Sequence, residues 1–123
     1  MMTARILAVD DSPTIRGLVA NVLRNAGFEV FLASDGVEGV GTLADADPDL
    51  IITDINMPKM DGFGLIEAVR ETGGYSSIPI LVLTTESSQE LKMRARKAGA
   101  TGWIGKPFED EHFISVINRV LGR

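Results

Sequence analysis

Short apolar runs alternate with amphipathic stretches along the chain. Each run holds four or five mostly apolar residues between polar or turn-forming ones, as in strands buried on both faces of a sheet. Between the runs, apolar residues recur every three or four positions, as they do along one face of a helix. The pattern predicts strands at 5–9, 29–33, 49–53, 80–83 and 102–105, each followed by a helix.

Residues that begin or end helices stand where the helical pattern starts and stops. Ser12 can cap the first helix, and Pro13 suits its first position. Gly27 suits the position just after its C-terminus. Gly39 and Gly41 each cost the second helix about 1 kcal/mol relative to alanine, so we expect a weaker helix there.

Five strand–helix units in succession predict the fold class. Short connections between alternating strands and helices imply parallel strands joined by right-handed crossovers. We therefore expect an α/β, doubly wound, five-stranded parallel sheet flanked by five helices. A closed barrel would need about twice the length. The 123 residues suggest one domain, 1–123, with no output domain attached after the last amphipathic stretch.

Composition excludes several classes of function. Hydrophobic residues make up 45% of the chain, which is enough for a core, and cysteine is absent. No apolar run approaches the roughly 20 residues that span a bilayer, and no leader pattern precedes the first strand. The net charge of −5 argues against non-specific binding to nucleic acid. We therefore expect a cytoplasmic protein that binds neither membrane nor nucleic acid.

Polar side chains follow four of the predicted strands. Asp10 and Asp11 end the first run, Asp54 ends the third, and Thr84 and Lys106 follow the last two. Parallel strands bring these residues to one carboxyl edge, where open α/β folds place their sites. Three crowded carboxylates favour a bound divalent cation, and one of them can act as a nucleophile toward phosphorus.

Each of these residues also has a simpler interpretation when it is taken alone. The two adjacent aspartates could be a helix-entry pair favoured by the helix dipole, and Asp54 could be a turn residue. Lys106 could be solvated, and Thr85 competes with Thr84 for any role. Pro107 is a candidate for a cis peptide bond after Lys106. The coincidence of the whole set favours a site.

Together these motifs resemble a response-regulator receiver domain of the stand-alone chemotaxis (CheY) type. The resemblance covers essentially the whole chain and implies a flavodoxin-like sheet with the strand order 2-1-3-4-5. The residues that carry it are Asp10-Asp11, Asp54-Ile55-Asn56-Met57-Pro58, Asp61-Gly62, Thr84 and Lys106-Pro107.

The resemblance implies a role for each site residue. Asp54 would accept a phosphoryl group from the phosphohistidine of a histidine kinase. Asp11, Asp54 and the backbone carbonyl of Asn56 would bind Mg²⁺ directly, and Asp10 would hold a metal-bound water. The protein would catalyse only its own phosphotransfer and autodephosphorylation, and so would not be an enzyme with turnover. Two side chains would contact the phosphoryl oxygens: Thr84 and Lys106.

Further positions match the chemotaxis type. Asn56 and Glu86 form the pair found in rapidly dephosphorylating regulators of this kind. Trp103 falls where the family places a switch aromatic, which is more often tyrosine or phenylalanine. Thr84, drawn toward the phosphoryl group, would leave space into which Trp103 could pack. Thr85 is larger than the usual residue and could narrow access to the acceptor and slow hydrolysis.

The expected partner surface lies around the fourth helix. Lys92, Arg94, Arg96 and Lys97 make a basic patch, which with Trp103 could bind an acidic amphipathic peptide. The alternative is a solvated helix face. The resemblance implies a histidine kinase and the flagellar motor switch protein as partners, a phosphatase as a further candidate, and a monomeric state.

Other functions compete with motor control. A phosphate sink would drain the kinase without binding the motor. An Mg²⁺-dependent aspartyl-phosphate hydrolase is disfavoured, because such enzymes place their aspartates within one loop and need a cap for which this chain is too short. A pseudo-receiver that only scaffolds is disfavoured because the site is complete.

Overall fold

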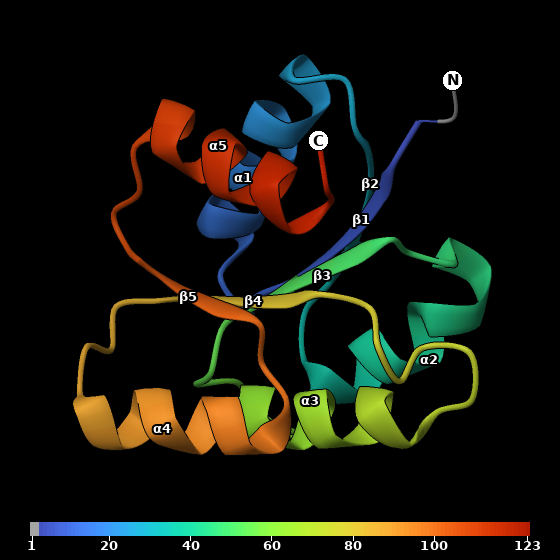
Figure 1. The fold of residues 1–123 in the computed structure, drawn as a ribbon, viewed down its shortest axis with the longest axis vertical. Coiled ribbons are helices and arrows are strands. Elements are labelled where there is room, and N and C mark those ends of the chain that lie inside the picture. Colours follow the sequence, from blue (N-terminus) through green and yellow to red (C-terminus); the bar gives the residue numbers. More distant parts are fainter. Residues whose placement is uncertain (1–2) are drawn as a thin grey trace.

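The computed structural model describes residues 3–123 and contains a five-stranded parallel sheet (Figure 1). The strands begin and end close to the predicted positions. Their bounds are β1 (Arg5–Val9), β2 (Glu29–Ala33), β3 (Leu50–Thr53), β4 (Ile80–Thr84) and β5 (Gly102–Gly105).

Five helices alternate with the strands. They are α1 (Pro13–Asn25), α2 (Gly36–Ala46), α3 (Gly62–Glu71), α4 (Gln89–Ala98) and α5 (Asp110–Val120). Figure 1 shows α1 and α5 on one face of the sheet and the other three helices on the opposite face. Within residues 3–123, no helix is both long and apolar enough to cross a membrane.

The strand order is β2-β1-β3-β4-β5, which confirms the predicted doubly wound topology. The register sets which residues meet at the carboxyl edge. Val9 pairs with Thr53, so the residues that follow β1 and β3 emerge side by side. Thr84 pairs with Gly105, so Lys106 leaves β5 next to the end of β4.

Each face of the sheet carries its own apolar core. Leu23 of α1 and Phe113 of α5 are fully buried against one face. Leu65 and Val69 of α3 are fully buried against the other. A fully buried leucine or phenylalanine contributes roughly 1.5–3 kcal/mol, so the two cores hold the strands in register and fix the edge that carries the polar residues.

The helix ends follow the local rules read from the sequence. Ser12 caps α1, its hydroxyl accepting a hydrogen bond from the Ile15 N–H at 3.2 Å. Gly27 follows the C-terminus of that helix with a φ of 93°.

In α2, a Cβ on Gly39 would lie 3.2 Å from Val9 and 3.3 Å from Leu65. The glycine that weakens α2 therefore also lets the helix pack closely.

Candidate functional site

Three carboxylates converge at the carboxyl edge of β1 and β3. One oxygen each from Asp10, Asp11 and Asp54 lies within 4.8 Å of the others. Asp10 is buried, Asp54 is half-buried and Asp11 is exposed, so the cluster opens to solvent on one side. The three negative charges repel one another, because partial burial reduces their screening by water. A hard divalent cation prefers oxygen ligands and would relieve this repulsion.

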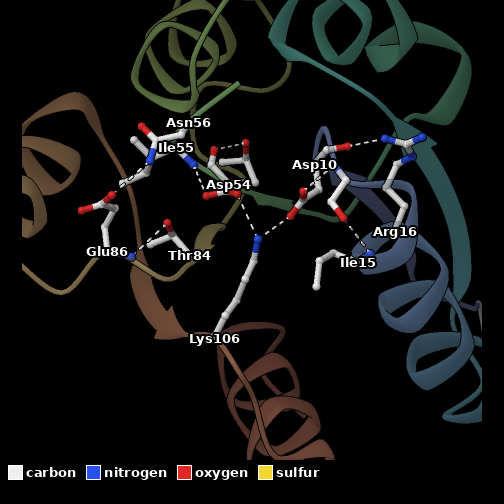
Figure 2. A network of polar contacts seen from close by, with 11 residues as sticks. Asp10, Ile15, Arg16, Asp54, Ile55, Asn56, Thr84, Glu86 and Lys106 are labelled. Carbon is white, nitrogen blue, oxygen red and sulfur yellow. Dashed lines mark hydrogen bonds and ion pairs between the residues drawn. The ribbon is translucent and has the colours of Figure 1, made fainter. Parts of the chain in front are cut away.

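Lys106 points into this cluster from the end of β5 (Figure 2). Its Nζ lies 2.7 Å from Oδ2 of Asp10 and 2.9 Å from Oδ2 of Asp54. Burial by itself lowers the pKa of Lys106, but hydrogen bonds and Coulomb attraction to the two aspartates outweigh it and raise the pKa overall. The lysine is therefore a fixed positive charge at the site. Its peptide bond to Pro107 is cis, as the sequence suggested.

The carboxylates differ in how they are held. Asp10 accepts a hydrogen bond from the Ser12 N–H at 3.0 Å through Oδ1, which leaves Oδ2 for the lysine. Asp54 accepts one from the Ile55 N–H at 2.6 Å in the same way. Asp11 has no side-chain hydrogen bond or ion pair within residues 3–123. It is the carboxylate that can bind a cation without breaking an existing contact.

Glu86 connects the loop that follows β3 to β4 and β5. Its N–H donates to Oγ1 of the buried Thr84 at 3.3 Å, and its carboxylate accepts from the Asn56 amide at 3.1 Å (Figure 2). Its carbonyl accepts the indole N–H of Trp103 at 3.1 Å. The two predicted rate-tuning residues are thus in contact. Thr85 is exposed.

The three residues of the predicted partner surface lie together. Lys92, Arg96 and Trp103 line a hollow of about 280 Å³ between α4 and β5. Arg94 instead places its guanidinium over the ring of Phe63 in α3, 4.0 Å from the centroid. Arg94 therefore leans toward α3 while remaining exposed, and the basic patch on α4 stays a prediction.

Two features of the structure were not predicted from the sequence. Arg16 donates from Nη1 to the backbone carbonyl of Asp10 at 2.6 Å. Its position near the start of α1 is the available signal, because helix side chains lean toward the N-terminus and so over the preceding loop. A groove of about 1170 Å³ also runs between α1 and α5 beside Lys106 and Phe108. Leu18, an apolar residue on α1, is 52% exposed in it.

The fold and the acid–lysine cluster define a class of protein, and a family match agrees with it. The model of the response regulator receiver domain matches residues 6–118, and the chain belongs to that family. The chemotaxis protein CheY1 of Helicobacter pylori is 40% identical over 120 residues, which cover 96% of this chain and 97% of that protein. The sensor histidine kinase CheAY of the same organism is 34% identical over 118 residues, but this chain spans only 15% of its length.

Similar solved structures agree with this family assignment. The chemotaxis protein CheY4 of Vibrio cholerae is 46% identical, with a TM-score of 0.93 and coverage of 97% of this chain and 99% of that one. The receiver domain of the sensor histidine kinase PA1611 from Pseudomonas aeruginosa has a TM-score of 0.91 at 26% identity, covering 99% and 100% of the two chains. That structure holds a magnesium ion coordinated in the active site cleft.

Proposed function

We propose that this protein is a phosphorylation-switched regulator of a chemotaxis two-component pathway, with Asp54 as the phosphoacceptor. The observation that carries the proposal is the convergence of three carboxylates and the Lys106 ammonium at one sheet edge. Two members of this cluster contact the lysine, and Asp54 is the less buried of them. That combination suits a nucleophile whose product needs a nearby positive charge.

The phosphoryl donor is a phosphohistidine of a histidine kinase. A carboxylate oxygen of Asp54 forms a bond to phosphorus while the phosphorus–nitrogen bond breaks. The electron pair stays on the imidazole nitrogen, which then takes up a proton. Lys106 offsets the negative charge that gathers on the phosphoryl oxygens, and the Thr84 hydroxyl donates to one of them. The chain would act only on its own aspartyl phosphate and would not turn over a free substrate.

The donor set fits Mg²⁺. Asp11, Asp54 and the carbonyl of Asn56 would hold the ion, which supplies positive charge toward the phosphoryl oxygens when bound. Both oxygens of Asp10 already accept hydrogen bonds, from Ser12 and Lys106. Both oxygens of Asp54 accept hydrogen bonds as well, so the role proposed for Asp10, holding a metal-bound water, rests on the family resemblance.

The kinase would approach along the groove between α1 and α5. This groove is lined by Lys106 and Phe108, so it runs from the acceptor site across an apolar surface. A donor domain seated there could present its phosphohistidine to Asp54 without crossing the output surface between α4 and β5.

The switch would run through Glu86. In the unphosphorylated protein the Thr84 hydroxyl accepts the Glu86 N–H, and the Glu86 carbonyl accepts the Trp103 indole N–H. A phosphoryl group on Asp54 adds acceptor oxygens that draw Thr84 toward the site. The movement would loosen Glu86 and let Trp103 repack, and a Thr84→Ala variant should therefore bind phosphoryl analogues without changing its output surface.

The output surface would bind an acidic amphipathic peptide, and the flagellar motor switch protein is the proposed partner. Lys92 and Arg96 supply positive charge beside the Trp103 ring at the hollow between α4 and β5. Charge complementarity of this kind sets the on-rate and the specificity of a peptide. A phosphatase is a further proposed partner, and the protein, a single receiver domain over 1–123, would act as a cytoplasmic monomer.

The test is the affinity for an N-terminal peptide of the motor switch protein, with Mg²⁺, in the presence and absence of beryllofluoride. Beryllofluoride mimics the phosphoryl group on Asp54, and Trp103, the single tryptophan, provides a fluorescence signal. We expect tighter peptide binding with beryllofluoride and no change in an Asp54→Asn control. If beryllofluoride binds without affecting the peptide, a phosphate sink becomes the better account.

A further inference from the structure

We propose that Arg16 is a positioning residue that holds the loop after β1 so that Asp11 faces the divalent cation. The inference rests on the proposed function, because the orientation of Asp11 matters only if a cation binds there. It concerns a residue on α1 whose side chain does not itself touch the acceptor or the phosphoryl group.

The geometry of the loop singles out Arg16. Its guanidinium donates to the carbonyl of Asp10 at 2.6 Å, and this carbonyl belongs to the peptide group that joins Asp10 to Asp11 (Figure 2). Holding that oxygen fixes the plane of the peptide, and the plane sets the direction in which the Asp11 side chain leaves the backbone.

Asp11 depends on this support more than its neighbours do. Asp10 and Asp54 are each held by a backbone N–H and by Lys106. The Asp11 carboxylate has no such partner in the part of the chain that the structure describes, so its place is set by the backbone alone. A ligand with few contacts of its own needs outer residues to orient it.

The direction of the change in Mg²⁺ affinity distinguishes a positioning role of Arg16 from a purely electrostatic one. Arg16 is a positive charge close to the cluster, and a cation bound there would be repelled by it. Removal of the charge alone would therefore strengthen Mg²⁺ binding. Loss of positioning would weaken it, because Asp11 would then occupy many orientations.

The experiment is a calorimetric titration of Mg²⁺ into the wild type and three variants. Arg16→Met removes the charge and the donors but keeps an unbranched stem, and Arg16→Lys keeps the charge and one donor group. Arg24→Met is the matched control, because Arg24 lies on the same helix and donates to the Val30 carbonyl at 3.4 Å, away from the site.

We expect Arg16→Met to bind Mg²⁺ roughly tenfold more weakly, within the range seen when outer residues of metal sites are changed. Arg16→Lys should recover most of that loss, and Arg24→Met should match the wild type. At saturating Mg²⁺, the rate of Asp54 phosphorylation by a small acyl phosphate should return to within about twofold of the wild type, because the chemistry itself does not use Arg16.

Several results would overturn the inference. Equal or tighter Mg²⁺ binding by Arg16→Met, measured on protein whose urea unfolding shows it to be folded, would leave Arg16 only an electrostatic or surface role. A phosphorylation rate that stays low at saturating Mg²⁺ would place Arg16 in the chemistry instead. If the wild type itself binds no Mg²⁺, the proposed function fails and not this inference alone.

Discussion

Replacing Lys106 with methionine removes the positive charge that two aspartates share. The Lys106 side chain is 9% exposed, and its partners Asp10 and Asp54 are 8% and 12% exposed. Methionine has an unbranched stem of similar length, so the apolar packing of that stem is largely kept. The variant therefore tests the charge and leaves the shape of the site almost unchanged.

The expected loss follows from this burial. Breaking a buried ion pair by removing one partner costs about 3–5 kcal/mol, because the remaining charge is left uncompensated. The cluster lies at an open edge where water reaches Asp11, so the lower end of that range applies. We expect the free energy of unfolding to fall by about 3 kcal/mol without divalent cations, which a domain with a stability of roughly 5–15 kcal/mol tolerates.

Urea unfolding monitored by far-UV circular dichroism, in EDTA and in Mg²⁺, measures both parts of the prediction. Mg²⁺ should stabilise Lys106→Met more than the wild type, because the ion replaces the missing charge without competing with the lysine. A tenfold tighter Mg²⁺ affinity would add about 1.4 kcal/mol to the stabilisation at high Mg²⁺ concentration.

Lys59→Met is the matched control. Lys59 also pairs with an aspartate, Asp35, but at 3.9 Å and with a side chain that is 70% exposed. Asp35 is buried, but the long distance and the solvated lysine limit the contribution of this pair to about 1 kcal/mol at most. A loss below about 1 kcal/mol for Lys106→Met, or an equal gain from Mg²⁺ in variant and wild type, would refute the role of Lys106 as the counter-charge of the cluster.

The same comparison has a predicted dependence on pH. The pKa of Lys106 in the folded protein is raised above its ordinary value of 10.5. Because the pKa is raised by folding, the charged lysine contributes its full stability at any pH below its pKa in the unfolded protein. That contribution is lost as the pH rises through its pKa in the folded protein. The gap in stability between wild type and Lys106→Met should therefore hold from neutral pH to about 10.5 and close above it.

Three further predictions concern the surroundings of the site. A Cβ on Gly62 would overlap the backbone carbonyl that follows β3, so Gly62→Ala should lower the free energy of unfolding by about 1–3 kcal/mol in urea and slow phosphorylation. Gly41→Ala, where a Cβ meets no atom within 4 Å, should not destabilise the protein and serves as its control. The Asn56→Ala and Glu86→Ala variants should change the rate of autodephosphorylation non-additively, because their side chains are in contact. We expect a coupling energy of about 0.5 kcal/mol or more in a double-mutant cycle, and additive effects on the rate would exclude coupling. Arg70 donates to the carbonyls of Ile78 and Gly99 at 2.7 Å each and so ties α3 to the end of α4. Arg70→Met should cost about 1.5–3 kcal/mol in urea unfolding, and a loss near zero would contradict this role.

Local patterns in the sequence determined most of the fold. Buried runs of four or five residues separated by helical periodicity leave few alternatives to a parallel sheet covered on both faces. The N-cap at Ser12 and the C-terminal Gly27 act through contacts within a few residues, and the structure has both where expected. The set of polar residues at strand ends was also visible, since it depends only on where each apolar run stops.

The tertiary structure decided the contacts between those ends. The hydrogen bonds from Lys106 to Asp10 and Asp54 join residues 96 and 52 positions apart, and their lengths depend on the register of neighbouring strands. Arg16 contacts the Asp10 carbonyl because of the orientation of α1 against its neighbours. Arg94 lies over Phe63 because of the orientation of α4. These orientations are set by the packing of both cores at once, and no local stretch of sequence contains them.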